Sequence, residues 1–198
     1  AFAGAHLEVG TAAGGTLCRM LACLPDDGGF VVVDRMQYYD DQLASFQRNL
    51  ERHGVDPARV DLRVASSADA YREAAARGER FEFALIDAGH GLLDVTRDLR
   101  WLRLLAPGGV VAFHDYDDRW SHRGVRVAVD RFERRHPEYE RIAHTGTLVA
   151  LRKRHAARAR EVDARDWAHA VALGLPLRLL RAAGKRAKRR RRRRARAA

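Results

Sequence analysis

Cysteine is scarce in this sequence, and long apolar stretches are absent. The two cysteines, Cys18 and Cys23, lie five residues apart in one predicted helix, which is neither a disulfide framework nor a zinc-binding pattern. This usage favours a reducing, cytoplasmic setting. No apolar run approaches the ~20 residues that a membrane-spanning helix requires, and no secretory signal precedes the first predicted strand. The 198 residues therefore predict one soluble domain with a sizeable core rather than a disulfide-stapled miniprotein.

The sequence also lacks an initiator methionine and reaches its first predicted strand within a few residues. We therefore expect N-terminal helices to be missing from this chain. Acidic residues are absent from Arg178–Ala198, which holds 12 of the 37 lysines and arginines. The other residues carry 25 bases and 26 acids, so the net charge of +11 belongs to a tail rather than to the body. Any inference about nucleic acid or anionic membranes is therefore limited to the tail.

Short apolar runs alternate with longer helical patterns up to about residue 154. This alternation is typical of a parallel sheet with helices on both faces, and the last two strands, separated by Thr145-Gly146-Thr147, indicate a hairpin. The predicted fold class is α/β: a doubly wound, mostly parallel Rossmann-like sheet closed by a C-terminal antiparallel hairpin. The predicted strands are His6–Val9, Phe30–Val33, Val60–Ala65, Phe81–Ile86, Val110–Phe113, Tyr139–His144 and Leu148–Arg152, and the predicted helices include Gln42–His53, Ala68–Arg77, Leu92–Leu105 and Gly124–Arg135.

Polar residues at the carboxyl ends of these strands form a candidate cofactor site, because open α/β sheets bind ligands at that edge. The first strand leads into Glu8-Val9-Gly10-Thr11-Ala12-Ala13-Gly14, whose glycines let a ligand approach the backbone where a helix begins. Ala12 breaks the Gly-x-Gly-x-x-Gly pattern of dinucleotide sites, and the acid beside the loop repels phosphate but attracts an ammonium group. Asp34 can accept both hydroxyls of a ribose, and Ser66-Ser67 can contact an adenine edge. A plain strand-to-helix turn is the alternative interpretation of the glycines alone.

Four segments of the sequence carry a family resemblance: His6–Thr11, Val33-Asp34, Leu85–His90 and Leu105–Asp115. Together they resemble class I S-adenosylmethionine-dependent methyltransferases, and most closely the small bacterial group related to macrocin O-methyltransferase and cephalosporin hydroxylase. The most diagnostic part is Ile86-Asp87-x-x-His90, followed by Pro-Gly-Gly and Phe-His-Asp. The resemblance covers residues 5–154, and the sequence departs from the family at Ala88-Gly89 and Gly91-Leu92, which affects the acceptor pocket rather than the binding fold.

The resemblance implies S-adenosylmethionine as cofactor and a sugar or another small hydroxylated molecule as acceptor. Glu8, Gly10 and Gly14 would hold the methionine portion, Asp34 the ribose and Ser67 the adenine end. The complete set of expected cofactor-binding residues is Glu8, Gly10, Thr11, Gly14, Asp34, Ser67 and Asp87. The polar and aromatic residues from Tyr116 to His122 are candidates for lining the acceptor pocket, with an ordinary surface loop as the alternative.

The chemical site is expected at the ends of two neighbouring strands. Asp87 and Asp115 should lie on strands about 4.8 Å apart, and two carboxylates on one edge suit Mg²⁺, which would acidify a bound hydroxyl. By resemblance to metal-dependent members, Asp87 and Asp115 are the metal-ligand candidates and His90 the general base. His114 stands where related enzymes often carry an acid. The alternatives are aspartates that only cap turns and a loop histidine without chemical role.

Residues 1–154 form the predicted S-adenosylmethionine-binding domain, and residues 155–198 a helical segment that continues into an Arg-rich tail. We expect the end of the tail to be disordered, because runs of cations repel one another. The tail is a candidate for non-specific contact with nucleic acid or an anionic membrane. A catalytically silent cofactor-binding domain tethered by the tail is therefore the alternative to an enzyme. A nicotinamide-dependent oxidoreductase is disfavoured by Ala12 and the terminal hairpin, and the oligomeric state, homo-oligomers included, is left open.

Overall fold

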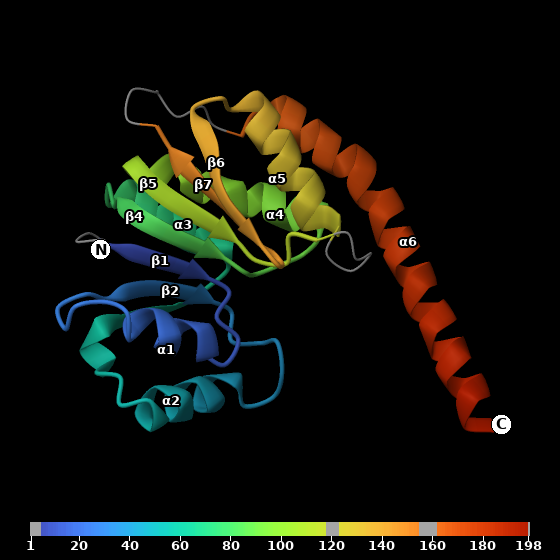
Figure 1. The fold of residues 1–198 in the computed structure, drawn as a ribbon, viewed down its shortest axis with the longest axis horizontal. Coiled ribbons are helices and arrows are strands. Elements are labelled where there is room, and N and C mark those ends of the chain that lie inside the picture. Colours follow the sequence, from blue (N-terminus) through green and yellow to red (C-terminus); the bar gives the residue numbers. More distant parts are fainter. Residues whose placement is uncertain (1–4, 118–122, 155–161, 198) are drawn as a thin grey trace.

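The computed structural model describes residues 5–117, 123–154 and 162–197, and these build one seven-stranded sheet. The strand order is β3-β2-β1-β4-β5-β7-β6, parallel from β3 to β5 and antiparallel at β7 and β6 (Figure 1). This confirms the predicted doubly wound sheet with its terminal hairpin. The strands are β1 (His6–Val9), β2 (Phe30–Asp34), β3 (Val60–Val64), β4 (Phe81–Ile86), β5 (Leu105–Phe113), β6 (Tyr139–Thr145) and β7 (Leu148–Lys153).

Helices cover both faces of the sheet because successive strand residues point to opposite sides. Val32 packs with Leu17 of α1 and Phe46 of α2, whereas its neighbour Val33 belongs to the larger core that includes Tyr71 of α3. The helices are α1 (Gly15–Leu21), α2 (Gln42–Arg52), α3 (Ser67–Ala76), α4 (Leu92–Asp98), α5 (Arg123–Arg135) and α6 (Ala164–Ala197), with the 3₁₀ helices η1 (Pro57–Arg59) and η2 (Leu99–Leu104). The sheet therefore lies between two separate apolar cores.

The order of the strands places a switch point between β1 and β4. The chain moves outward from β1 to β2 and β3, and then returns to the other side of β1 with β4. Beyond the strand ends, the Gly10 amide bonds the Val33 carbonyl at 2.8 Å, and the Asp87 amide bonds the Val9 carbonyl at 2.8 Å. These two bonds draw the segments after β1 and β4 to one edge of the sheet, where open α/β folds bind ligands.

The segment between β4 and β5 differs from its prediction. A single helix was expected over Leu92–Leu105, but the α-helix ends at Asp98 and a 3₁₀ helix continues to Leu104. The next strand begins at Leu105 rather than at Val110, because Pro107-Gly108-Gly109 forms an irregularity within the strand instead of preceding it. Pairing with β4 jumps from Leu105 to Val110, which is how a β-bulge accommodates residues that cannot join a regular ladder.

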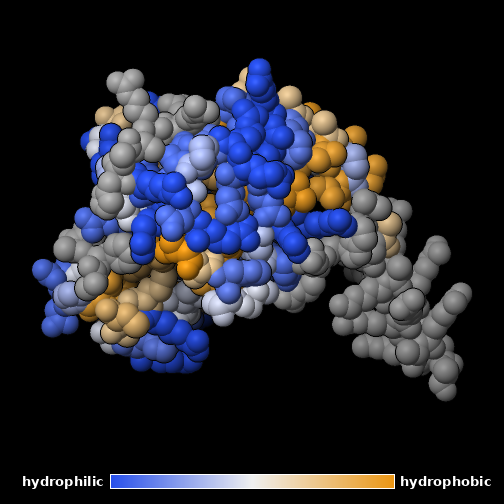
Figure 2. Space-filling view, turned by 45° about the horizontal axis from the view of Figure 1, so that its top comes forward, coloured by the Kyte–Doolittle hydropathy of each residue, from blue (hydrophilic) through white to orange (hydrophobic). Residues whose placement is uncertain are grey.

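Helix α6 extends from the domain as a long rod (Figure 1). It runs through the Arg-rich segment, where the sequence analysis expected disorder; alanine and arginine are both strong helix formers. Ala170 is buried against the main core, but Val171, Leu175 and Leu179 are each more than 60% exposed. Figure 2 shows apolar surface on the side of the domain where α6 lies. Within the described residues, none of the helices has the length and apolar character needed to cross a bilayer.

Candidate functional site

The glycine-rich loop after β1 approaches the backbone after β4 very closely. Gly10 has a φ of +86°, and a Cβ added there would lie 2.5 Å from the Asp87 carbonyl oxygen. Gly14 has a φ of +78°, and an added Cβ would lie 2.9 Å from the ring of Phe46. Any side chain at Gly10 or Gly14 would therefore clash with a neighbour, which explains in structural terms why glycine occupies both positions.

Helix α2 holds this loop by two amide side chains that the sequence analysis did not identify. Gln42 Nε2 donates to the Ala12 carbonyl at 3.0 Å, and Asn49 Nδ2 donates to the Ala13 carbonyl at 2.8 Å. Ala12 itself has a positive φ of 49°, which is unfavourable for an L-residue with a side chain. No local sequence pattern indicates that amides thirty or more residues further along support the loop.

Glu8 lies in β1 with only 1% of its surface exposed, on the sheet face covered by α1 and α2. Burial raises its pKa to about 8; the Thr11 side chain opposes this shift, and the charges of Asp87 and Asp34 add to it. Its Oε2 atom has no hydrogen-bond partner among the described residues. Glu8, Asp34 and Asp87 thus belong to one edge of the sheet, and burying a carboxyl oxygen there without a partner costs free energy.

Asp34 already accepts four hydrogen bonds in the structure. Its Oδ2 accepts from the backbone amides of Thr11 at 2.9 Å and Ala12 at 3.3 Å. Its Oδ1 accepts from the Met36 amide at 2.7 Å and from Gln42 Nε2 at 3.2 Å. The carboxylate therefore ties the end of β2 to the glycine-rich loop, and its role toward a ribose stays a prediction that requires some of these bonds to be exchanged.

The Ser67 hydroxyl is engaged inside the domain. It donates to Asp98 Oδ1 at 2.5 Å and accepts from Trp101 Nε1 at 3.0 Å. Asp98 is buried, and desolvation raises its pKa to about 7 while the bond from Ser67 opposes that shift. The contact between Ser67 and an adenine stays a prediction; Ser67 is the first residue of α3, so its backbone amide has no partner within the helix.

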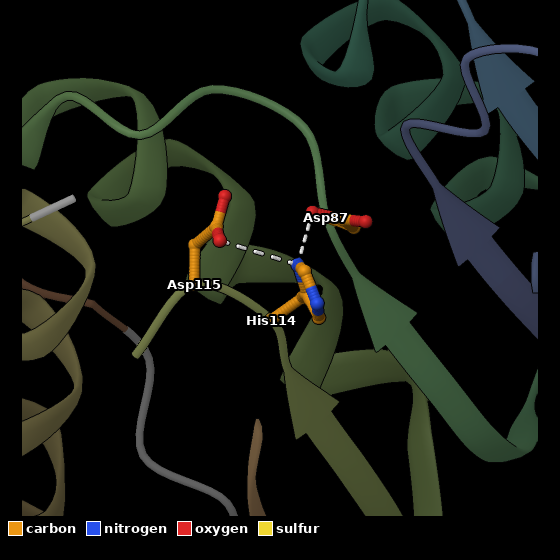
Figure 3. Close-up of side chains that lie close together, drawn as sticks. All are labelled: Asp87, His114 and Asp115. Atoms are coloured by element: carbon orange, nitrogen blue, oxygen red, sulfur yellow. Dashed lines mark ion pairs between the residues drawn. The ribbon is translucent and has the colours of Figure 1, made fainter. Parts of the chain in front are cut away.

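Asp87, His114 and Asp115 point toward one another at the ends of β4 and β5 (Figure 3). The pairing of Ile86 with Phe113 places Asp87 across from His114, and His114 Nδ1 lies 3.2 Å from Asp87 Oδ1 and 3.5 Å from Asp115 Oδ1. Asp115 has a φ of 57°, a sparsely populated conformation that is often found at functional sites. The predicted neighbourhood of Asp87 and Asp115 is thus present, and His114 joins it.

His90 lies beside this cluster. Its Nε2 atom is 2.9 Å from Asp115 Oδ2, so one carboxylate faces both histidines, with Oδ2 toward His90 and Oδ1 toward His114. A carboxylate in this position fixes the tautomer of a histidine and raises its basicity. The structure therefore joins His90 and Asp115 in one pair, whereas the sequence analysis assigned them separate roles.

The candidate residues of the acceptor loop lie mostly outside the described part of the chain. Residues 118–122, which include Trp120 and His122, are among those not described. Tyr116 is buried, and its hydroxyl donates to Asp130 at 2.6 Å and accepts from Arg141 at 3.0 Å. Tyr116 therefore anchors the start of this loop to α5 and β6.

A family model described as "Methyltransferase domain" matches residues 7–116, which is more than half of the chain and contains every residue predicted to bind the cofactor or a metal or to act as the base. The chain belongs to this methyltransferase family. No curated protein matches its sequence. The methyltransferase fold is nevertheless evident from solved structures.

The O-methyltransferase TomG from Streptomyces achromogenes, solved with S-adenosylmethionine, has a TM-score of 0.60 and 22% identity over 76% of this chain and 73% of its own. An O-methyltransferase from Bacillus cereus, solved with S-adenosylhomocysteine, has a TM-score of 0.60 and 20% identity over 75% and 74%. CalS11, a TDP-rhamnose 3'-O-methyltransferase, has a TM-score of 0.58 and 18% identity over 75% and 71%. At these identities the likeness shows the fold, that of class I S-adenosylmethionine-dependent methyltransferases.

Proposed function

We propose that this methyltransferase transfers a methyl group to a hydroxyl oxygen of a small molecule, such as a sugar. The observation that carries the proposal is the pair of His90 Nε2 and Asp115 Oδ2, 2.9 Å apart at the same sheet edge as the glycine-rich loop. Oxygen needs such a base, because an alcohol is a poor nucleophile at neutral pH. Three structural neighbours are named as O-methyltransferases, and one of them acts on a TDP-linked rhamnose, which supports an oxygen acceptor.

The residues at the edge suit S-adenosylmethionine. When bound, this cofactor supplies a methyl group on a positively charged sulfur. The buried Glu8 oxygen without a partner would receive the ammonium of its methionine portion, and Gly10 and Gly14 would leave room beside the loop. Asp34 would receive the ribose in exchange for contacts that it now makes with loop amides, and the Ser67 backbone would meet the adenine.

His90 would remove the acceptor proton. Its Nε2 atom lies 2.9 Å from Asp115 Oδ2, and the carboxylate would raise the basicity of the imidazole that receives the proton from the hydroxyl group. The deprotonated oxygen would be the nucleophile for the methyl group that the cofactor supplies, and the electron pair of the broken carbon–sulfur bond would stay on sulfur. Asp115 stabilises the resulting imidazolium by its negative charge. Asp87 and Asp115 would also hold a divalent ion, whose charge would make the bound hydroxyl more acidic.

Calorimetry and product analysis test this function. We expect S-adenosylhomocysteine to bind, and S-adenosylmethionine with a panel of nucleotide sugars, glycosides and catechols to yield a methyl ether that mass spectrometry detects. His90→Gln should lower turnover by roughly two orders of magnitude and leave the affinity for S-adenosylhomocysteine unchanged. The exposed His53, replaced by Gln, is the matched control.

Three results would contradict the proposal. A folded protein without affinity for S-adenosylhomocysteine would reject the cofactor, and methylation only at nitrogen, carbon or sulfur would reject the oxygen acceptor. Equal turnover of His90→Gln and wild type would reject the assignment of His90 as the general base.

A second candidate function is tethering by the basic tail. It is favoured by the exposed apolar side chains of Val171, Leu175 and Leu179, which recur every fourth residue of α6 just before the basic run. An apolar stripe followed by clustered cations is a pattern that binds anionic membranes. In this alternative the cofactor domain is catalytically silent, and the tail supplies the function.

A further inference from the structure

The cluster of Asp87, His114 and Asp115 adds a histidine to the two aspartates that the sequence analysis named as metal-ligand candidates. It contains two carboxylates and one imidazole, supplied by the ends of two adjacent strands (Figure 3). One donor atom from each residue can be chosen so that all three lie within 4.8 Å of one another. Three such atoms converging from a rigid sheet edge form one side of a coordination shell.

The histidine atom in this cluster has no hydrogen bond. His114 Nδ1 is buried and has no hydrogen-bond partner among the described residues, although Asp87 Oδ1 is only 3.2 Å away. Its separations from the two carboxylate oxygens, 3.2 and 3.5 Å, are close to the ~3.0–3.4 Å expected between two ligand atoms that each lie about 2.1 Å from one ion. Three electron-pair donors facing one point favour a cation between them.

The second oxygen of Asp115 is held from the other side. His90 Nε2 lies 2.9 Å from Asp115 Oδ2, which directs Oδ1 toward His114. Partners of this kind orient carboxylate ligands in metal sites and contribute to metal affinity. His90 would therefore act on the ion through Asp115 without being a ligand itself.

We propose that Asp87, His114 and Asp115 bind a first-row transition ion such as Mn²⁺, Co²⁺ or Zn²⁺ in preference to Mg²⁺. The inference deepens the proposed function, because it defines the ion at the same site. Mg²⁺ favours oxygen ligands and loses its water reluctantly. An imidazole nitrogen suits softer divalent ions, and a histidine in place of an acid also removes one negative charge that a hard cation would use.

Metal titration without cofactor or acceptor tests this inference on the full chain. After treatment with a chelator, calorimetry should show Mn²⁺, Co²⁺ and Zn²⁺ binding at one site at least tenfold more tightly than Mg²⁺. Bound Co²⁺ should give an absorption spectrum that changes in His114→Asp. His114→Asp should weaken the binding of Co²⁺ and Zn²⁺ and strengthen the binding of Mg²⁺. The ratio of the affinities for the transition ions and for Mg²⁺ should therefore fall by about tenfold or more. His114→Asn is a second variant, which offers an amide oxygen in place of the imidazole nitrogen and adds no charge.

Controls separate this site from adventitious binding. The exposed residues Cys23 and His144 are also metal-binding types, so Cys23→Ser and His144→Gln should leave the stoichiometry and affinity unchanged. Unfolding temperature and S-adenosylhomocysteine affinity show whether the His114 variants are folded.

Three outcomes would overturn the inference: equal affinity for Mg²⁺ and the transition ions, no effect of the His114 variants, or no bound ion at all. In the last case the cluster is only an ion pair. Retained S-adenosylhomocysteine binding would then show that the methyltransferase function stands without this metal, whereas its loss would count against the proposed function itself.

Discussion

Glu8 is a buried acid whose unpaired oxygen is explained if a cation binds beside it. Its pKa of about 8 means that the ligand-free protein holds a proton there at pH 6–7. A bound ammonium favours the carboxylate, so cofactor binding must release that proton. We therefore expect S-adenosylhomocysteine to release roughly one proton at pH 7, and its affinity to rise about tenfold per pH unit between pH 6 and 7.5.

This linkage is measurable by calorimetry in two buffers with different ionisation enthalpies. Glu8→Gln should bind more weakly at pH 7.5, release no proton and show a flat pH profile. Glu51→Gln, at an exposed position of α2, is the control and should behave as wild type. Heats that are the same in both buffers for the wild type would contradict the assigned role of Glu8.

Asp98 provides a pH-dependent contribution to stability that is separate from the reaction. Burial raises its pKa to about 7, well above the unfolded value of 3.8, so the native state binds its proton more tightly than the unfolded chain does. The contribution is therefore fully present below pH 4 and is lost as pH rises toward 7. From pH 5 to pH 8 this amounts to about 3 kcal/mol of unfolding free energy.

Asp98→Asn should remove most of that loss, because the amide oxygen can still accept from Ser67 while no charge forms. Urea unfolding at pH 5 and pH 8 measures the difference between variant and wild type. Glu73→Gln, an exposed acid on α3 paired with Arg77, controls for charge removal alone. If the two proteins lose stability in parallel between these pH values, Asp98 does not titrate in this range.

At the scale of elements, the N-terminal turn of α5 sets the position of the segment that carries His90. Gly124 lies so close to that segment that an added Cβ would be 2.4 Å from the His90 carbonyl oxygen and 2.5 Å from the Leu92 amide. Only a residue without a side chain permits this contact. Gly124→Ala must therefore move α5 and the His90 segment apart.

We expect Gly124→Ala to lower turnover by about tenfold or more, because displacing a catalytic group by an ångström can cost up to a hundredfold. The affinity for S-adenosylhomocysteine should change little, since the glycine-rich loop belongs to β1 and α1. Gly174→Ala in α6, where nothing lies within 4 Å, is the matched control. Unchanged turnover in Gly124→Ala would mean that the His90 segment is not held in place by α5.

The elements themselves were mostly predictable, because buried parallel strands appear in sequence as short apolar runs between helical patterns. The predicted helix and strand boundaries were wrong at Leu99–Gly109. Pro107, Gly108 and Gly109 lie inside a bulged strand there, but in the sequence they resemble the end of a helix. Asp87 and Asp115 could be placed together from the edge rule alone. His114 could not be assigned, because its contact with Asp87 depends on the register that pairs Ile86 with Phe113.

The side chains that hold the glycine-rich loop in place could not be predicted either. Gln42 and Asn49 lie in α2, and the donation of their amides to the Ala12 and Ala13 carbonyls depends on how that helix packs across α1. The contacts of the Ser67 hydroxyl were equally unpredictable, because its partners Asp98 and Trp101 are 31 and 34 residues away in the sequence. Sequence patterns gave the residue types at the sheet edge, whereas side-chain direction required the packed structure.

At the scale of the whole molecule, charge and chemistry are separated. The family match and every residue proposed to bind the cofactor or a metal or to act as the base lie within residues 7–116, whereas 12 of the 37 lysines and arginines lie in residues 178–198. Helix α6 carries these residues away from the domain (Figure 1), and Ala170 anchors its first half in the core. Loss of residues 178–198 should therefore leave the sheet edge intact.

We expect a chain that ends at residue 177 to keep its S-adenosylhomocysteine affinity and its turnover of a soluble acceptor within about twofold, because no site residue is removed.

The full chain should sediment with vesicles that contain phosphatidylserine, lose this binding as salt rises, and lose it entirely on truncation. Val171→Ser with Leu175→Ser keeps every charge and removes apolar contact, so it should weaken vesicle binding. If this double variant binds vesicles as wild type does, and single-stranded RNA competes the protein off them, the tail is a non-specific polyanion binder rather than a membrane anchor. If truncation abolishes turnover of a soluble acceptor, the separation of tail and site is wrong.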